Sequence, residues 1–208
     1  MTIARVTLKD WIAWSLIAGG VVSLGKVGLD TARAAAYQRQ YQSALHAAAH
    51  SRPTLGTGVA PPASIGEPIG WLEIPRIGVS AGVVHGDSDA LLTVAIGHLP
   101  DTSLPWSGGN SALAGHRDTF FRPLRDVRAG DMVHFATPHG DFQYRVRETF
   151  IVDPEDLWVL DSTPAAMLTL ITCYPFDYVG NAPQRFIVRA ERIDTSTEDA
   201  MSAAKQAS

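Results

Sequence analysis

The chain has only one cysteine, Cys173, among its 208 residues. It therefore cannot form an internal disulfide, and any fold exported to an oxidising compartment must be stable without one. Basic residues are not in excess either: there are 17 Lys and Arg against 21 Asp and Glu, a formal net charge of -4. This balance gives no basic footprint for a nucleic acid, so it argues against a DNA- or RNA-binding role.

Long uncharged apolar runs are also scarce. Residues 11–25 carry no charge but are few for a membrane span. Extension to Leu29 gives nineteen residues, about 28 Å of helix at ~1.5 Å per residue, which crosses a bilayer if Lys26 snorkels to the interface. We expect residues 1–30 to form a cytoplasmic tip and a signal-anchor helix. A cleaved signal peptide and a buried core helix are the alternatives, and the flanking positive charges do not favour an inside amino terminus.

The segments on either side of the main domain have simple compositions. Residues 31–50 are rich in Ala and contain no Gly or Pro, which predicts a helical stalk. Residues 53–68 are dense in Pro, Gly, Ser and Thr and are typical of a linker, so 31–68 are assigned to stalk and linker. Residues 195–208 are small and polar and are expected to be a flexible tail.

Metal binding finds little support in the sequence. His46 and His50 are four residues apart, on one face of the expected helix, but no third ligand is nearby. The acidic run at 153–156 contains Pro directly after Asp, which is more typical of a helix start than of a metal site. We expect no metal and no cofactor.

From residue 69 onward, short apolar runs rich in Val, Ile, Phe and Thr are separated by turn residues. Only brief helical turns are expected between them, near 120–127 and 155–160. Many short strands at this spacing predict a mostly β domain of roughly 125 residues, closed or sandwich-like, over 69–194. The expected strands are 70–74, 77–84, 111–115, 132–136, 142–152, 168–172 and 185–193.

Three residues of this domain have the chemistry of acyl transfer. Cys173 follows an apolar strand, and Pro175 then stops the ladder, so the thiol lies at a strand end where it can face a cleft. A reactive thiol needs a base or a cation nearby, and His116 ends its own apolar run in the same way. Arg185 begins the last strand, and an antiparallel return would place it beside Cys173 as an oxyanion donor. Arg189, farther along the same strand, is expected to be solvated. The alternatives are a small buried thiol, a structural histidine and a surface arginine.

Several motifs resemble those of one enzyme family. Thr-Leu-Ile-Thr-Cys-Tyr-Pro at 169–175 resembles the TLxTC signature of sortases, and Ser-Ala-Leu-Ala-Gly-His-Arg-Asp at 111–118 is similar to their histidine motif. Residues 176–188 resemble the loop that leads to the sortase arginine, and 70–78 resemble the first strand of that domain. The order His, Cys, Arg also matches, and the Cys-Tyr-Pro variant is most similar to class D.

The resemblance implies a closed eight-stranded β-barrel with short helices, preceded by a transmembrane helix and a helical stalk. It implies a single-pass protein of the cell membrane with its catalytic domain outside. Cys173 would attack the threonine carbonyl of an LPxTG-like sorting signal, with His116 as acid and base and Arg185 at the oxyanion. The thioacyl group would pass to an amine of peptidoglycan or a pilin. Thr172, and His98 from an expected loop at 96–100, are candidates for positioning the substrate.

Three other classes of protein are compatible with parts of this pattern. An exported cysteine hydrolase would use the same residues, with water as the acceptor. A cell-wall L,D-transpeptidase usually carries Ser/Thr-His-Gly before its cysteine, whereas Thr172 directly precedes Cys173 here. A non-catalytic, wall-binding β-domain would need none of the three residues.

Overall fold

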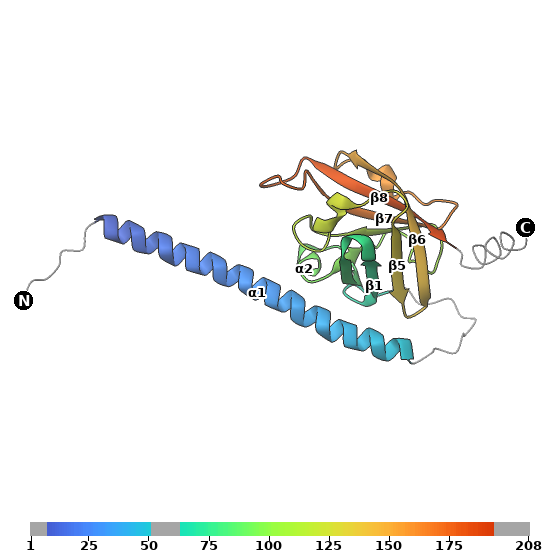
Figure 1. The fold of residues 1–208 in the computed structure, drawn as a ribbon, viewed down its shortest axis with the longest axis horizontal. Coiled ribbons are helices and arrows are strands. Elements are labelled where there is room, and N and C mark those ends of the chain that lie inside the picture. Colours follow the sequence, from blue (N-terminus) through green and yellow to red (C-terminus); the bar gives the residue numbers. More distant parts are fainter. Residues whose placement is uncertain (1–7, 51–62, 194–208) are drawn as a thin grey trace, which may run out of the picture.

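The computed structural model describes residues 8–50 and 63–193, which form one long helix and a β-barrel (Figure 1). The α-helices and 3-10 helices are α1 (Leu8–His50), η1 (Pro75–Ile77), α2 (Asp89–Leu92), η2 (Arg122–Asp126) and η3 (Leu157–Leu160). The strands are β1 (Pro68–Ile74), β2 (Val79–His85), β3 (Ile96–His98), β4 (Asn110–Ala114), β5 (Met132–Thr137), β6 (Gly140–Val152), β7 (Met167–Tyr174) and β8 (Gln184–Ile193).

The strands close into a barrel in the order β1-β2-β3-β4-β7-β8-β6-β5, and β5 pairs back to β1. Two neighbouring pairs are parallel, β2 with β3 and β4 with β7. The other neighbours are antiparallel. Closure pairs every strand on both sides, so this sheet has no free edge. The eight-stranded barrel expected from the resemblance is confirmed.

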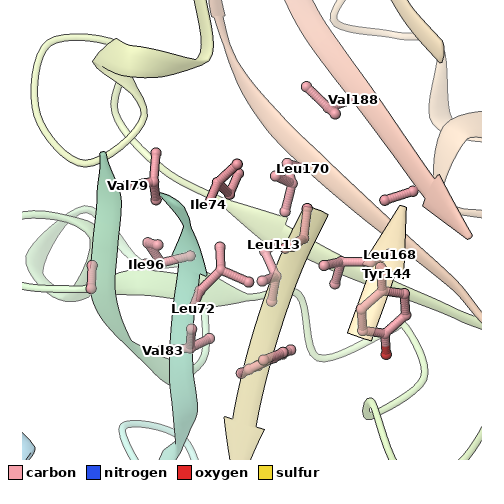
Figure 2. Close-up of a cluster of buried hydrophobic side chains, with 14 of the residues drawn as sticks. Leu72, Ile74, Val79, Val83, Ile96, Leu113, Tyr144, Leu168, Leu170 and Val188 are labelled. Atoms are coloured by element: carbon pink, nitrogen blue, oxygen red, sulfur yellow. The ribbon is translucent and has the colours of Figure 1, made fainter. Parts of the chain in front are cut away.

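Alternation of side chains along each strand builds the core. In β6, Phe142, Tyr144 and Val146 point inward and are buried, whereas Arg145 and Arg147 between and after them are exposed. Burial raises the pKa of Tyr144 to about 12, so its phenol stays neutral inside the barrel. Figure 2 shows side chains from strands on opposite sides of the barrel meeting in this core, among them Leu72, Ile96, Leu113, Leu168 and Val188.

Each of the seven predicted strands corresponds to an observed one, with ends shifted by a few residues. Two details of the prediction were wrong. Residues 96–98, expected in a loop, form β3, which is too short for alternation to be visible in the sequence. Ile77, expected to begin a strand, ends η1 instead, and Gly78 then turns the chain with a positive φ of 70°.

The segments expected as anchor and stalk form one continuous helix, α1. Its first half projects away from the barrel, and its second half runs alongside it (Figure 1). Within residues 8–50 and 63–193, no helix combines the length and the apolar character needed to cross a membrane. Most of the expected linker and all of the expected tail, 195–208, lie outside the described residues.

A buried pair of histidines joins β2 to β3. His85 and His98 are partners in the parallel ladder, and their Nδ1 atoms are 3.1 Å apart. The Nε2 of His98 lies 3.0 Å from the carbonyl oxygen of Ser103, which can only accept, so this nitrogen carries a hydrogen. In the neutral pair, His98 Nδ1 is then the acceptor and His85 Nδ1 the donor. Desolvation by burial lowers the pKa of His98, the Ser103 bond partly opposes this, and the charge of His85 lowers the pKa further.

We predict from this pair that acid destabilises the fold. Because the pKa of His98 is lower in the folded chain than in the unfolded one, the unfolded state binds more protons below about pH 6.5. The free energy of unfolding should therefore fall as the pH drops from that value toward the folded pKa. Urea unfolding between about pH 5 and 8 measures this slope. His98→Gln keeps a donor for Ser103 but cannot take up a proton, so it should flatten the slope. An unchanged slope in this variant would contradict the assignment.

Candidate active site

The pairing of β4 with β7 brings the predicted histidine and cysteine together. The two strands are parallel, with Asn110 opposite Met167 and Ala114 opposite Ile171. Continued by two residues, the same register sets His116 beside Cys173. The thiol is half-buried near the end of β7, which runs to Tyr174 rather than stopping at Thr172 as expected.

The other neighbour of β7 supplies the arginine. Cys173 and Arg185 are directly opposite each other in the antiparallel ladder of β7 and β8, so their side chains leave the same face of the sheet. Nη1 of Arg185 donates to the carbonyl oxygens of Ala182 at 3.3 Å and Gln184 at 3.0 Å. These bonds hold the guanidinium at the mouth of the loop between β7 and β8. They use only Nη1, so Nη2 and Nε remain as further donors of this group.

The chain around His116 is fixed by close packing. A Cβ at Gly115 would lie 2.7 Å from the ring of Phe121, which is fully buried, so a larger residue cannot replace Gly115 without moving that ring. The backbone N–H groups of Thr119 and Phe121 both donate to the carbonyl oxygen of His116. The hydroxyl of Thr172 donates to the carbonyl oxygen of Gly115 at 2.7 Å. The segment after β4 and strand β7 therefore both hold the backbone next to His116 in place.

The three side chains line one cleft of about 450 Å³ at the barrel rim. Its other walls come from the residues after His116 and from the loop between β7 and β8. Thr172 and His98 are not among the described residues that line it. Thr172 is buried against Gly115, and His98 is buried against His85. The lining residues are His116, Arg117, Asp118, Cys173, Gly180, Asn181, Ala182 and Arg185.

Arg117 is a site residue that the sequence did not single out. Its Nη2 donates to the carbonyl oxygens of Tyr178 at 2.8 Å and Gly180 at 2.9 Å, and its guanidinium lies 6.0 Å from the centre of the Tyr178 ring. It thus ties the loop after β7 to the segment that carries His116. Its Nη1 is buried and has no partner within residues 8–50 and 63–193. The only feature of the sequence that could have indicated this role is the position of Arg117 directly after His116. An arginine exposed to solvent could occupy the same position.

Arg189 was expected to be solvated, and this was wrong. It is half-buried on β8, with its guanidinium 5.1 Å from the centre of the Trp158 ring and 5.7 Å from that of Phe150. The two rings are stacked at 5.5 Å, so Arg189 belongs to an aromatic cluster on the barrel wall, away from the cleft. In the part of the chain that the structure describes, no cluster of three or more His, Cys, Asp or Glu side chains could hold a metal ion.

Comparison with known proteins identifies the family to which the chain belongs. Residues 72–193, more than half of the chain, match the family model described as Sortase domain. The chain belongs to the sortase family. Sortase D of Bacillus subtilis is 38% identical over 129 residues, which cover 62% of this chain and 65% of that relative, just under two thirds of its length.

Solved sortase structures share the fold. A sortase D5 transpeptidase of Clostridium perfringens has a TM-score of 0.63 over 78% of this chain and 99% of its own, and its 24% identity supports the fold alone. A C. perfringens sortase C, solved with the C-terminal cell wall sorting motif, is 25% identical with a TM-score of 0.59 and covers 75% of this chain and 86% of its own.

We predict that Arg117 controls the mobility of the loop between β7 and β8. Arg117→Gln removes two charge-assisted bonds to loop carbonyls, each worth about 1.5–3 kcal/mol, so amide hydrogen exchange at 176–182 should accelerate about tenfold or more. Arg125→Gln is the matched control. Arg125 touches the same loop through an ion pair with the exposed Asp177 and a cation–π contact with Phe176, 5.5 Å from the ring centre, and exposed contacts of this kind contribute little. If amide hydrogen exchange accelerated equally in both variants, the bonds of Arg117 would not be what restrains the loop.

Proposed function

We propose that this chain is a transpeptidase that cleaves an LPxTG-like sorting signal at the threonine carbonyl and transfers the acyl group to an amine of the cell envelope. The observation that supports this most is the convergence of Cys173, His116 and Arg185 on one cleft, from three neighbouring segments of the barrel. A thiol, an imidazole and a guanidinium are together sufficient for thioacyl chemistry.

In the first half of the reaction, the proton of the Cys173 thiol passes to His116, and the sulfur attacks the threonine carbonyl carbon. The carbonyl oxygen becomes an oxyanion, and the free Nη2 and Nε donors of Arg185 stabilise it. The tetrahedral intermediate collapses when the carbon–nitrogen bond breaks and His116 gives a proton to the departing amine. The products are a thioester on Cys173 and a free amine. Loss of one oxyanion donor typically costs about 2.7–4 kcal/mol, so we expect the loss of Arg185 to slow this step strongly.

In the second half, an incoming primary amine attacks the thioester carbon. His116, now neutral, takes the proton from that nitrogen, and the carbon–sulfur bond breaks to give a new amide and the thiolate of Cys173, to which His116 can return the proton. One histidine therefore acts as acid and then as base. The choice of a sorting signal as substrate is supported by the C. perfringens sortase C that was solved with such a motif.

Thr172 and His98, the two candidates for positioning the substrate, have different roles in the proposal. Thr172 holds the carbonyl oxygen of Gly115, next to His116, so we assign it to positioning of the catalytic segment and, through it, of the substrate. His98 is fully buried and bonded within the barrel wall, and we assign it to the stability of that wall.

We also propose that residues 1–30 anchor the protein in the cell membrane, with the catalytic domain, 69–194, outside the cell. The support is a series of large apolar side chains on α1 that are exposed to solvent in the isolated chain and would be covered by lipid. These residues are Trp11, Trp14, Leu16, Ile17, Val21, Val22, Leu24 and Leu29. Lys26 interrupts this series close to its end, where its side chain can reach the interface.

The catalytic proposal predicts a covalent intermediate. Incubation of the full chain with a panel of LPxTG-like peptides should add the acyl fragment to Cys173, as intact-mass and peptide mass spectrometry would show. Addition of a primary amine should convert this adduct into an amide product. Cys173→Ala should abolish adduct and product, and Cys173→Ser should leave at most trace activity, with unfolding curves close to the original.

The alternatives give different results in the same experiment. A hydrolase would release the free acid whether or not an amine was present. A non-catalytic wall-binding domain would form no adduct with any peptide. Full peptide processing by Cys173→Ala would overturn both the proposed activity and the role of the thiol.

The anchoring proposal predicts that the full chain sediments with membranes and is released by detergent but not by high salt. Replacement of both Ile17 and Val21 by Lys places two charges in the centre of the apolar segment, each costing about 3 kcal/mol on insertion. This double variant should move to the supernatant. Ala35→Lys with Ala36→Lys, two exposed positions farther along the same helix, is the matched control and should stay with the membranes. Equal behaviour of the two double variants would contradict the anchor.

A further inference from the structure

The side-chain amide of Gln38 joins helix α1 to the barrel. The Nε2 of Gln38 donates to the carbonyl oxygen of Val94 at 2.7 Å, and its Oε1 accepts from the backbone N–H of Gly82 at 2.8 Å. Gly82 lies on β2 just before that strand begins to pair with β3, and Val94 lies just before β3. Gln38 therefore bridges the gap between the two strands as a peptide group would, satisfying a donor and an acceptor at once.

The residues of α1 that face the barrel recur at helical spacing. Val27, Thr31, Ala34 and Gln38 follow one another at intervals of four, three and four residues, so they share one side of α1. Tyr37, beside them, is half-buried, and desolvation raises its pKa. The same side of α1 faces the start of β2 and the segment between β4 and η2, and it forms one wall of a groove of about 720 Å³. Figure 1 shows this half of α1 running alongside the barrel.

The groove and the cleft meet at His116. Both are lined by His116 and Asp118, but Cys173 and Arg185 line only the cleft, and α1 lines only the groove. His116 therefore borders both hollows. Asp118 is exposed, and it is the only acidic residue among the described residues that line either hollow. The rest of the groove is mostly small or apolar, with Ala34, Ala81 and Phe120 among its walls.

The proposed reaction needs two such hollows. It replaces one amide by another through a thioester, so the second half is chemically the reverse of the first. The nitrogen of the incoming amine must then occupy the place that the departing nitrogen left, next to His116. The acyl part of the substrate stays with Cys173 and Arg185 in the cleft. The part that follows the departing nitrogen, and later the acceptor, must extend to the other side of His116.

We propose that the groove between α1 and the barrel is the binding site for the amine side of the reaction. It first holds the departing segment of the sorting signal and then the acceptor, a slender peptide chain with a primary amine. The carboxylate of Asp118 attracts the ammonium form, which loses one proton to solvent to give the nucleophilic amine. His116 takes a second proton as the neutral nitrogen attacks the thioester. This inference rests on the proposed function. It assigns a substrate-binding role to residues 27–38, which lie outside the region matched by the family model.

The test uses a substitution that fills the groove and leaves the residues that line only the cleft unchanged. Ala34→Trp in the full chain places a large side chain on the groove wall, and Ala35→Trp makes the same change at an exposed position one residue along. Each thioacyl enzyme is offered triglycine, which extends into the groove, or hydroxylamine, which is too small to need it. Mass spectrometry quantifies the adduct on Cys173 and both products.

We expect Ala34→Trp to lower the ratio of triglycine product to hydroxylamine product by about tenfold or more, with Ala35→Trp within about twofold of the original. Gln38→Ala, which removes two hydrogen bonds between α1 and the barrel, should raise the KM for triglycine more than the KM for hydroxylamine. Asp118→Asn should also raise the KM for triglycine and should weaken its dependence on salt.

Two results would overturn the inference. One is an unchanged product ratio in Ala34→Trp. The other is an equal loss of both products in that variant, which would indicate general damage to the site. Failure of the proposed function looks different, since the unsubstituted chain would then form no adduct on Cys173 with any peptide.

Discussion

The site depends on the position of β7 between two partners of opposite direction. Its parallel pairing with β4 sets His116 beside Cys173, and its antiparallel pairing with β8 sets Arg185 opposite the same residue. Because side chains alternate between the two faces of a strand, a slip of one residue in either ladder would turn one of the three groups away from the others. The buried residues of β7, such as Leu168 and Leu170, secure both registers by filling the barrel core. The packing of the barrel core and the geometry of the site therefore depend on the same two strand registers.

This constraint explains how much of the site could be predicted. Cys173, His116 and Arg185 each lie at or beside the end of an apolar run, and strand ends at one barrel rim are close in space. Alternation also identified seven of the strands. It failed for β3, whose three residues gain their strand geometry from partners on both sides, β2 and β4. It also misjudged Arg189, since a period of two cannot show that Phe150 and Trp158 cover the outward face of β8.

Residues whose contacts are distant in sequence were beyond prediction for a related reason. Arg117 bonds to carbonyl groups more than sixty positions away, in a loop with no regular structure of its own. Gln38 finds its partners at Gly82 and Val94 only because the barrel leaves a donor and an acceptor unpaired at that point. In an Ala-rich helix with exposed neighbours, neither its residue type nor its position distinguishes it from a solvated glutamine. Such contacts follow from the closed barrel, and local patterns do not contain them.

The position of His116 between the cleft and the groove suggests how a thioacyl enzyme would react with an amine in preference to water. Water is far more abundant than any acceptor and reaches the thioester without a binding site. An amine competes only if it is held near the carbonyl carbon, where its effective concentration can exceed that of free solute by orders of magnitude. The cleft with Arg185 cannot supply this advantage, because the acyl chain occupies it. On the proposed assignment, the wall formed by α1 supplies it instead. The balance between transfer and hydrolysis would then depend on a helix outside the region matched by the family model, and on contacts such as the two hydrogen bonds of Gln38 that join this helix to the barrel.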